Sequence, residues 1–270
     1  EANHPSNWHA ATQAQDYVAI AHGSFVEPVK PLADLREQQG HRAAVVDIED
    51  VYDEFSFGEK TPQALKDFLQ SARTNWRAPP RFVVLVGDAT IDPRDYAGEG
   101  DADFVPTKQV PMAQVALETA SDDWFVDFDS NGLPDVPIGR LSVRTADQAE
   151  AVVAKLVSYD QSSPQPWTKD VMLVADQDAD GSNFEQHSVS LSALLPPDYT
   201  AHKIFRGALG ADATHRALID GVNDGQLIVN YTGHGSVQIW GKEGEVLTNE
   251  DVYAWARLAR AGGAGNLAEL

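Results

Sequence analysis

Residues 225–236 read Gly-Gln-Leu-Ile-Val-Asn-Tyr-Thr-Gly-His-Gly-Ser, an aliphatic run after a turn that stops at a histidine between two glycines. The run Leu227–Val229 is typical of a buried strand in a mostly parallel sheet. Reactive groups in open α/β sheets gather at the carboxyl ends of strands, so His234 is expected there. Because histidine titrates near neutrality, His234 is a candidate general acid or base. The alternative is a loop histidine in a glycine-rich turn without a chemical role.

Strand and helix patterns alternate through the rest of the chain. Short aliphatic runs bounded by turn residues predict strands, and apolar residues at helical spacing after a capping residue predict helices. This alternation is typical of an α/β protein with mostly parallel sheets flanked by helices. Strands are expected at 17–22, 43–48, 82–86, 171–175, 202–205 and 227–229. Helices are expected at 31–39, between Thr61 and Pro79, at 145–157, 185–195, 212–221 and 249–258.

The linking segments indicate two lobes. Ser162–Pro166 is the best candidate boundary, which predicts an N-terminal lobe at 1–163 and a C-terminal lobe at 164–270 that carries His234. Three other stretches are expected to be irregular or marginal: Glu1–Gln15 as a linker or trailing end, the acidic run from Asp47 to Glu54 as a solvated loop, and 104–107 with 109–112 as edge strands or a hairpin.

The charge balance narrows the choice of partners. Asp and Glu number 41 against 20 Lys and Arg, a formal net charge of −21. Such a surface repels nucleic acid and anionic membranes and attracts cations, so calcium is a better candidate partner than a polynucleotide. The alternative is simply a very soluble surface. No apolar run approaches the roughly 18 residues of a spanning helix, so no membrane span is expected.

Cysteine is absent from the 270 residues. The chain therefore offers no disulfide, no Cys-ligated zinc and no thiol nucleophile. It also starts at Glu1 without a methionine or signal peptide, which suggests a processed or excised piece.

Two loops share the pattern D-x-D-x-[DN]-G, in which alternate oxygen side chains can converge on a hard cation. Neither is an EF-hand, because Ile138 and His187 stand where the bidentate glutamate would be. A looser calcium loop completed by Asp135 or Glu185 is the hypothesis, and a solvated acidic turn is the alternative. The candidate ligands are Asp127, Asp129, Asn131 and Asp135 in the first loop, and Asp176, Asp178 and Asp180 in the second.

Other hydrolase patterns are weaker. His22 also follows a predicted strand, but it lacks the paired glycines. No G-x-S-x-G elbow occurs, and Ser236 is expected to point away from His234. Asp88 and Asp92 after one strand, with His234 after another, suggest a metal-dependent phosphoesterase. This is the less favoured enzymatic alternative, because the chain lacks a strand-end Asn-His pair and a second histidine beside His234.

Several motifs together resemble the gingipain-like cysteine peptidases. The resemblance spans nearly the whole chain, with the segments in the same order as in that family. It rests on Asn230–Ser236, Trp240-Gly241, Thr248–Val252, Val86-Gly87-Asp88, Ser121-Asp122-Asp123, Pro137–Leu141 and the loop Ala175–His187.

The resemblance implies a caspase-like α/β fold and peptide-bond hydrolysis by a histidine and a cysteine, with no cofactor needed for catalysis. His234 would be the catalytic histidine, and the backbone N–H of Gly235 would belong to the oxyanion hole. Protein or peptide substrates and a secreted or cell-surface location would follow. Glu185 could select a basic residue at the cleaved bond, whereas Phe184 in that position would favour an apolar one, with Trp240 nearby.

The missing nucleophile departs from the family pattern. The family's cysteine follows the helix that Asn249 opens, and here that helix runs into a Gly/Ala-rich tail. We expect truncation before the cysteine strand rather than a degenerate member, and no peptidase activity from this segment alone. The non-enzymatic alternative is a calcium-stabilised binding module.

Overall fold

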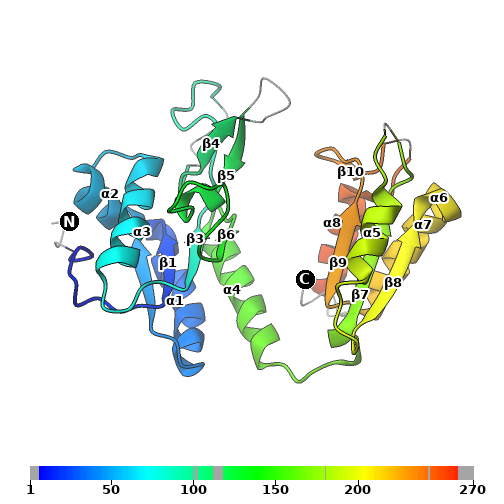
Figure 1. Cartoon of the computed structure of the whole chain (residues 1–270), viewed down its shortest axis with the longest axis horizontal. Coiled ribbons are helices and arrows are strands. Elements are labelled where there is room, and N and C mark those ends of the chain that lie inside the picture. Colours follow the sequence, from blue (N-terminus) through cyan, green and yellow to red (C-terminus); the bar gives the residue numbers. More distant parts are fainter. Residues whose placement is uncertain are drawn as a thin grey trace. The chain divides into compact units, whose positions relative to one another are not determined.

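The computed structural model describes residues 6–98, 100, 103–111, 118–179, 181–242 and 244–260. The chain divides into two compact units, Glu1–Asp160 and Gln161–Leu270 (Figure 1). This division lies a few residues before the boundary expected from the sequence. None of the described helices has both the length and the apolar character needed to cross a bilayer.

A four-stranded parallel sheet forms the centre of the first unit. Its strand order is β2-β1-β3-β6. The aliphatic runs that predicted three of these strands bury both faces of the sheet, as expected for parallel strands. The strands are β1 (Tyr17–Ala21), β2 (Ala43–Asp47), β3 (Phe82–Val86) and β6 (Ile138–Leu141), of which β6 was not expected.

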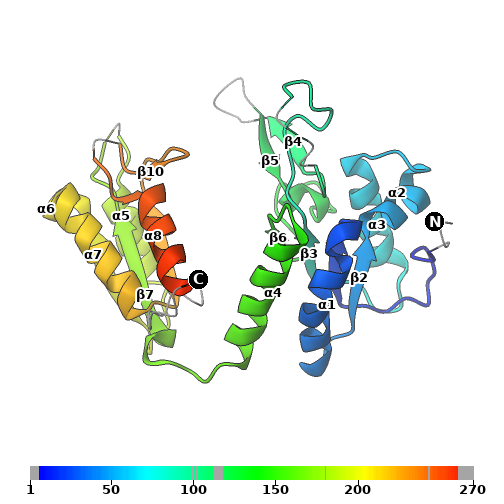
Figure 2. The same ribbon diagram turned by 180° about the vertical axis from the view of Figure 1, so that it is seen from behind.

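Helices cover both faces of this sheet (Figures 1 and 2). Side chains of β1 alternate between two apolar clusters: Val18 and Ile20 join one, and Ala19 and Ala21 join the other. This period of two is what places a helix layer on each side. The first cluster includes α2 (Ile48–Ser56) and α3 (Pro62–Asn75), and the second α1 (Gly23–Gln38) and α4 (Ala146–Gln161).

One helix prediction and one loop prediction in this unit were wrong. The helix expected at 31–39 begins at Gly23, with Pro28 and Pro31 inside it, because burial of the Phe25, Val29 and Leu32 face outweighs the proline penalty. The acidic run after β2 is α2 rather than a solvated loop. Asp47 caps its first turn by accepting a hydrogen bond from the N–H of Glu49 at 3.0 Å, and acidic residues near a helix N-terminus are favourable.

The described residues between β3 and β6 include an antiparallel hairpin. It pairs β4 (Lys108–Pro111) with β5 (Glu118–Ser121), so residues 104–107 are not a strand and Met112 lies outside the described residues. A short 3-10 helix, η1 (Asp123–Phe125), follows and buries Phe125 in the core.

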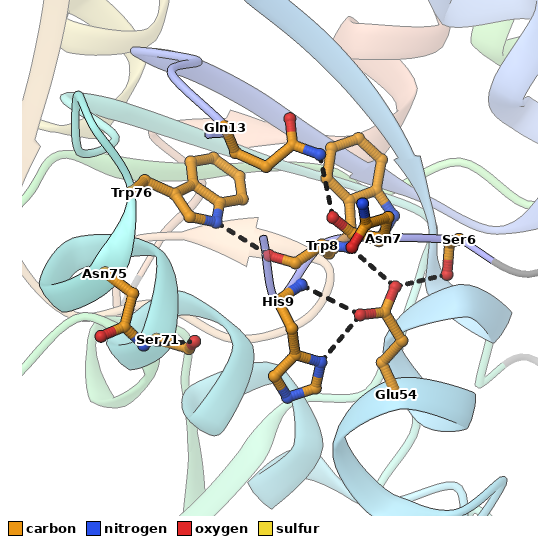
Figure 3. Close-up of polar contacts among 9 residues, drawn as sticks. All are labelled: Ser6, Asn7, Trp8, His9, Gln13, Glu54, Ser71, Asn75 and Trp76. Atoms are coloured by element: carbon orange, nitrogen blue, oxygen red, sulfur yellow. Dashed lines mark hydrogen bonds and ion pairs between the residues drawn. The ribbon is translucent and has the colours of Figure 1, made fainter. Parts of the chain in front are cut away.

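The N-terminal segment is held against α2 and α3 (Figure 3). The carboxylate of Glu54 accepts hydrogen bonds from the hydroxyl of Ser6 at 2.5 Å and from the backbone N–H groups of Trp8 and His9 at 2.8 and 3.0 Å. The indole N–H of Trp76 donates to the carbonyl of Trp8 at 2.8 Å. The prediction of a trailing end is therefore wrong from Ser6 onward, and residues 1–5 lie outside the described residues.

A three-stranded parallel sheet, in the order β8-β7-β9, forms the centre of the second unit. α5 (Phe184–Ser192) lies on one face, while α7 (Ala211–Asp224) and α8 (Asn249–Arg260) lie on the other (Figures 1 and 2). The remaining elements are β7 (Asp170–Ala175), β8 (Thr200–Phe205), β9 (Ile228–Thr232), β10 (Ile239–Trp240), β11 (Leu247–Thr248), η2 (Pro166–Lys169) and the single turn α6 (Arg206–Leu209).

Candidate active site

His234 lies in the loop after the carboxyl end of β9. Its carbonyl accepts hydrogen bonds from the hydroxyl of Tyr231 at 2.7 Å and from the backbone N–H of Gly241 at 2.8 Å. Gly235 forms an antiparallel bridge with Trp240. These contacts close the loop back on itself, so the backbone beneath the imidazole is fixed while 30% of the side chain stays exposed.

The imidazole faces a buried carboxylate. Nδ1 of His234 lies 3.5 Å from Oδ2 of Asp176, which directly follows β7. The other oxygen, Oδ1, accepts hydrogen bonds from Nη1 of Arg206 at 2.6 Å and from the N–H of Gln177 at 2.9 Å. The side chains of Asp176 and Arg206 are only 1% and 4% exposed. Parallel pairing of β7 with β9 places Asp176 and His234 at the same sheet edge.

The pKa of Asp176 is lowered from its ordinary value. Burial alone would raise it, but the hydrogen bonds from Arg206 and from the N–H of Gln177 outweigh burial. Asp176 is therefore a carboxylate at neutral pH. A buried carboxylate beside one ring nitrogen favours a proton on that nitrogen and leaves the other as the base.

Gly233 makes room for this arrangement. A Cβ at Gly233 would lie 2.4 Å from Cβ of Asp176 and 2.4 Å from the hydroxyl oxygen of Tyr231. By contrast, a Cβ at Gly235 would meet only the carbonyl oxygen of Ile239, at 3.6 Å. The first glycine of the pair is thus required by packing, and the second leaves the approach to its own backbone open.

Three expected substrate-binding residues lie in the same unit. The ring of Phe184 meets the ring of His234 edge-on, with centroids 5.1 Å apart. Oε1 of Glu185 accepts a hydrogen bond from the N–H of Gly207 at 2.9 Å. Trp240 stacks on Tyr231 with ring centroids 4.6 Å apart. The aromatic ring is therefore in contact with the imidazole, and the glutamate is bonded to the N–H of Gly207.

The second acidic loop has partners other than a metal. The carboxylate of Asp176 contacts Arg206 and His234. Oδ1 of Asp178 accepts a hydrogen bond from the N–H of Glu185 at 3.3 Å. Asp180 lies outside the described residues. Calcium binding by this loop gains no support from the side chains that are described.

The first acidic loop does gather carboxylates. Ligand oxygens of Asp127, Asp129 and Asp135 lie within 4.8 Å of one another, the single such group among the described residues. Asp127 accepts hydrogen bonds from the N–H groups of Asn131 and Gly132, each at 3.0 Å, which hold the turn without an ion. Asn131 lies beside the group: its amide oxygen accepts from the N–H of Leu133 at 2.8 Å, and its amide nitrogen donates to Asp129 at 2.9 Å. Calcium binding here stays a prediction.

The remaining candidates have local structural roles. Nδ1 of His22 accepts from the N–H of Ser24 at 3.3 Å, capping α1. The hydroxyl of Ser236 accepts from the N–H of Gln238 at 3.2 Å, inside its own turn. Asp88 pairs with Arg144 at 2.6 Å, and Asp92 accepts from the N–H of Ala97 at 2.7 Å. In the described part of the chain, neither Asp88 nor Asp92 belongs to a group of metal-ligand type.

Comparison with known proteins places the chain in a family. The sequence profile of peptidase family C25 matches residues 10–261. The chain belongs to peptidase family C25. Its family is thus that of the gingipain-like cysteine peptidases, as the sequence motifs indicated.

Individual relatives agree with the C25 assignment. Gingipain R2 of Porphyromonas gingivalis is 23% identical over 231 residues, which are 83% of this chain and 28% of that protein. Gingipain R1 of the same organism is 23% identical over 231 residues, 83% of this chain and 21% of that protein. The chain therefore spans less than a third of the length of these curated relatives.

Solved structures show the same fold. The crystal structure of the Arg specific cysteine proteinase gingipain R matches with a TM-score of 0.67 and 21% identity, over 90% of this chain and 52% of that one. A second structure, described as a protease, matches with a TM-score of 0.61 and 18% identity, over 88% of this chain and 48% of that one. The caspase-like α/β fold expected from the sequence is confirmed.

The sequence did not identify the groups around His234. Asp176 was interpreted as a calcium ligand because it opens an acidic loop, and Arg206 and Tyr231 were not singled out. One signal was available for Asp176, since a carboxylate directly after one core strand shares a sheet edge with a histidine after the next. Arg206 carried no local signal, because a lone arginine before a glycine is typical of any turn.

Proposed function

We propose that this chain carries the histidine side of a cysteine-peptidase active centre. The observation that supports the proposal most directly is the 3.5 Å distance between Nδ1 of His234 and Oδ2 of Asp176. The imidazole is partly exposed, whereas the carboxylate is buried. A histidine oriented by a third group is the arrangement that activates a thiol or hydroxyl nucleophile.

In this mechanism, Nε2 of His234 takes the proton from a cysteine thiol as the sulfur attacks the scissile carbonyl. Asp176 stabilises the imidazolium that forms, and the imidazolium then gives its proton to the leaving amine. The N–H of Gly235 would donate a hydrogen bond to the oxyanion. Because glycine has no side chain, the approach to this N–H is open. None of the 270 residues is a cysteine, so the thiol has to come from outside this sequence.

The edge of the sheet beside His234 is suited to a neighbouring strand. β9 is the last strand in the order β8-β7-β9, and among the described residues it pairs with β7 alone. Unpaired N–H and C=O groups along such an edge accept a further strand readily. A strand added there would end next to His234, which is where the sulfur is needed.

Contacts around the imidazole favour an apolar substrate side chain next to the cleaved bond. Phe184 forms an aromatic wall against His234, and Glu185 is engaged by the N–H of Gly207. A basic side chain would need a carboxylate, and Asp176 is already paired with Arg206. We therefore propose that Phe184 determines which substrate side chain is accepted at the cleaved bond, with Trp240 as a further apolar surface near the loop. This is favoured over selection of basic residues by Glu185.

We place the protein outside the cytoplasm, secreted or on a bacterial cell surface. Family membership and the net charge of −21 support this location. Catalysis by histidine and cysteine requires no cofactor, and protein or peptide substrates follow from the family.

The test uses a longer natural polypeptide that contains these residues together with a cysteine. Hydrolysis of a peptide library is expected to be abolished by iodoacetamide and by His234→Ala, and to show a preference for apolar residues at the cleaved bond. The matched control is His202→Ala, at a histidine of β8 whose side chain is 46% exposed, which should leave turnover unchanged. Retained hydrolysis in the His234 variant, or insensitivity of the wild type to alkylation, would contradict the proposal.

This chain alone is expected to leave the same peptides intact, because it has no thiol. Hydrolysis by the purified 270-residue chain would show that another nucleophile operates. The non-catalytic alternative, a calcium-stabilised binding module, is favoured by one observation, the group formed by Asp127, Asp129 and Asp135.

A further inference from the structure

We propose that Arg206 is a positioning residue for His234, acting through Asp176. The inference rests on the proposed function, because it concerns how the histidine of that function is oriented. It assigns to Arg206 two tasks: to hold the carboxylate of Asp176 in one orientation, and to offset its charge so that His234 can serve as a neutral base.

Geometry supports the first task. Nη1 of Arg206 donates to Oδ1 of Asp176 at 2.6 Å, and this leaves Oδ2 facing Nδ1 of His234. The carboxylate thus uses one oxygen for the guanidinium and the other for the imidazole. Because the two side chains of the ion pair are 4% and 1% exposed, solvent competes little for either oxygen.

The surroundings fix Arg206 as well. A Cβ at Gly244 would lie 2.9 Å from Nη2 of Arg206, and one at Gly241 would lie 3.4 Å from Nη1. Both glycines have positive φ angles, 131° and 106°, so side chains are disfavoured there by conformation and by space. Gly241 also donates its N–H to the carbonyl of His234 at 2.8 Å. The guanidinium therefore lies between Asp176 and the loop that supports the histidine backbone.

Burial makes the second task necessary. A buried carboxylate with no counter-charge would either take up a proton or hold the imidazole in its charged form. Either outcome removes the base, because a protonated carboxyl cannot orient Nδ1–H and an imidazolium cannot accept a thiol proton. The positive charge of Arg206 avoids both outcomes.

Other ionisable groups around the pair come from three elements. On β9, the phenol of Tyr231 is neutral, since burial and the nearby charge of Asp176 raise its pKa. On α5, Glu185 is bonded to the N–H of Gly207. In the loop with Gly241, Lys242 is exposed. The guanidinium of Arg206 is the cation that contacts the carboxylate.

The experiment is an NMR titration of the histidine side chains in this chain, which needs no peptide hydrolysis. Loss of peptidase activity in other tests would therefore not affect its reading. In Arg206→Met the midpoint of the His234 titration should rise, because an uncompensated carboxylate favours imidazolium. In Asp176→Asn the His234 midpoint should fall, because the arginine charge is then unopposed. Arg206→Lys should stay nearest to the wild type.

Two controls separate positioning from general effects. Lys203→Met removes one positive charge from an exposed site on β8 and should leave the His234 midpoint unchanged. His215, whose Nε2 lies 3.1 Å from Asp251, serves as an internal reference in every variant. If Arg206→Met fails to fold, Arg206→Lys and Arg206→Gln give the same comparison. A His234 midpoint that stays unchanged in the Arg206 variants, or moves only together with that of His215, would overturn the proposal.

Discussion

Glu54 accepts a hydrogen bond from the backbone N–H of Trp8 at 2.8 Å, although 46 positions separate the two residues (Figure 3). The same carboxylate binds Ser6 and His9, so a single side chain of α2 holds the N-terminal segment. Trp8 packs against Phe68 of the core. The N-terminal segment is therefore part of the first unit.

Glu54→Gln should destabilise the first unit by about 1–3 kcal/mol, since it weakens charge-assisted hydrogen bonds to backbone N–H groups. Urea unfolding followed by tryptophan fluorescence measures the change, because Trp8 and Trp76 report on this contact. Glu59→Gln, at an exposed position, is the matched control and should have no effect. Equal midpoints for the two variants would contradict the anchoring role.

The same contact predicts a dependence on pH. Burial would raise the pKa of Glu54, but the hydrogen bonds from Ser6, Trp8 and His9 lower it below its ordinary value. A carboxyl group with a lowered pKa contributes stability above its unfolded pKa and loses it as pH falls through the folded value. The wild type should thus lose stability below about pH 4.5, the ordinary value for glutamate. Glu54→Gln should lose less over that range, which urea midpoints at pH 6 and pH 3.5 would test.

Gly233 and Gly235 should respond differently to alanine. Gly233→Ala places a Cβ 2.4 Å from Asp176 and Tyr231, so one of them must move, and overpacking of this kind costs about 1–3 kcal/mol. Gly235→Ala meets only an ordinary contact at 3.6 Å and should fold like the wild type. Thermal unfolding of both variants provides the comparison. Similar melting temperatures would show that the packing at Gly233 is not tight.

Arg140 should be the most sensitive arginine of the first unit. Its guanidinium binds the carboxylate of Asp122 at 2.7 and 2.8 Å and also donates to the carbonyls of Gly87, Val105 and Pro106. Arg140→Met leaves these acceptors without the guanidinium, which should cost about 3–5 kcal/mol. Arg77→Met, at an exposed side chain, is the control. A loss below about 1 kcal/mol, the scale of an exposed pair, would refute this assignment.

Calcium should stabilise the first unit if the carboxylates of the first acidic loop bind it. After chelation, added Ca²⁺ should release or absorb heat in a calorimetric titration and raise the melting temperature, as any ligand of the folded state does. Asp129→Asn should reduce both effects because it removes one carboxylate of the group. Asp67→Asn, an exposed residue of α3, is the control. Absence of heat and of a thermal shift would remove the calcium hypothesis.

Local pattern was sufficient for most of the sheet. The aliphatic runs of β1, β3 and β7 predict these strands, because strands buried on both faces need apolar side chains at successive positions. The runs of β2 and β9 also predict strands, but the expected burial of β9 was wrong, since Ile228 is exposed on this edge strand. β6 escaped prediction because Pro137 and Gly139 interrupt its apolar pattern. α2 escaped because its acidic residues were counted as solvated loop, while Ile48, Val51 and Tyr52 form a buried face.

The catalytic candidate was also accessible from sequence, but its surroundings were not. His234 between glycines after an aliphatic run is a local signal. Asp176 and Arg206 lie 30 positions apart in the chain, and no spacing rule joins them. Their pairing depends on parallel strands that bring distant strand ends to one edge.

By itself, the sequence determined the alternation of strands and helices, the position of His234 at a strand end, the family and the absence of a thiol. These follow from side-chain period, turn residues and composition, which are local or summed properties of the chain. Only the tertiary structure decided that Asp176 faces His234, and that Arg206 binds this carboxylate. The physical reason is that a buried charge must be paired, and which partner it meets is fixed by strand order and packing rather than by distance along the chain.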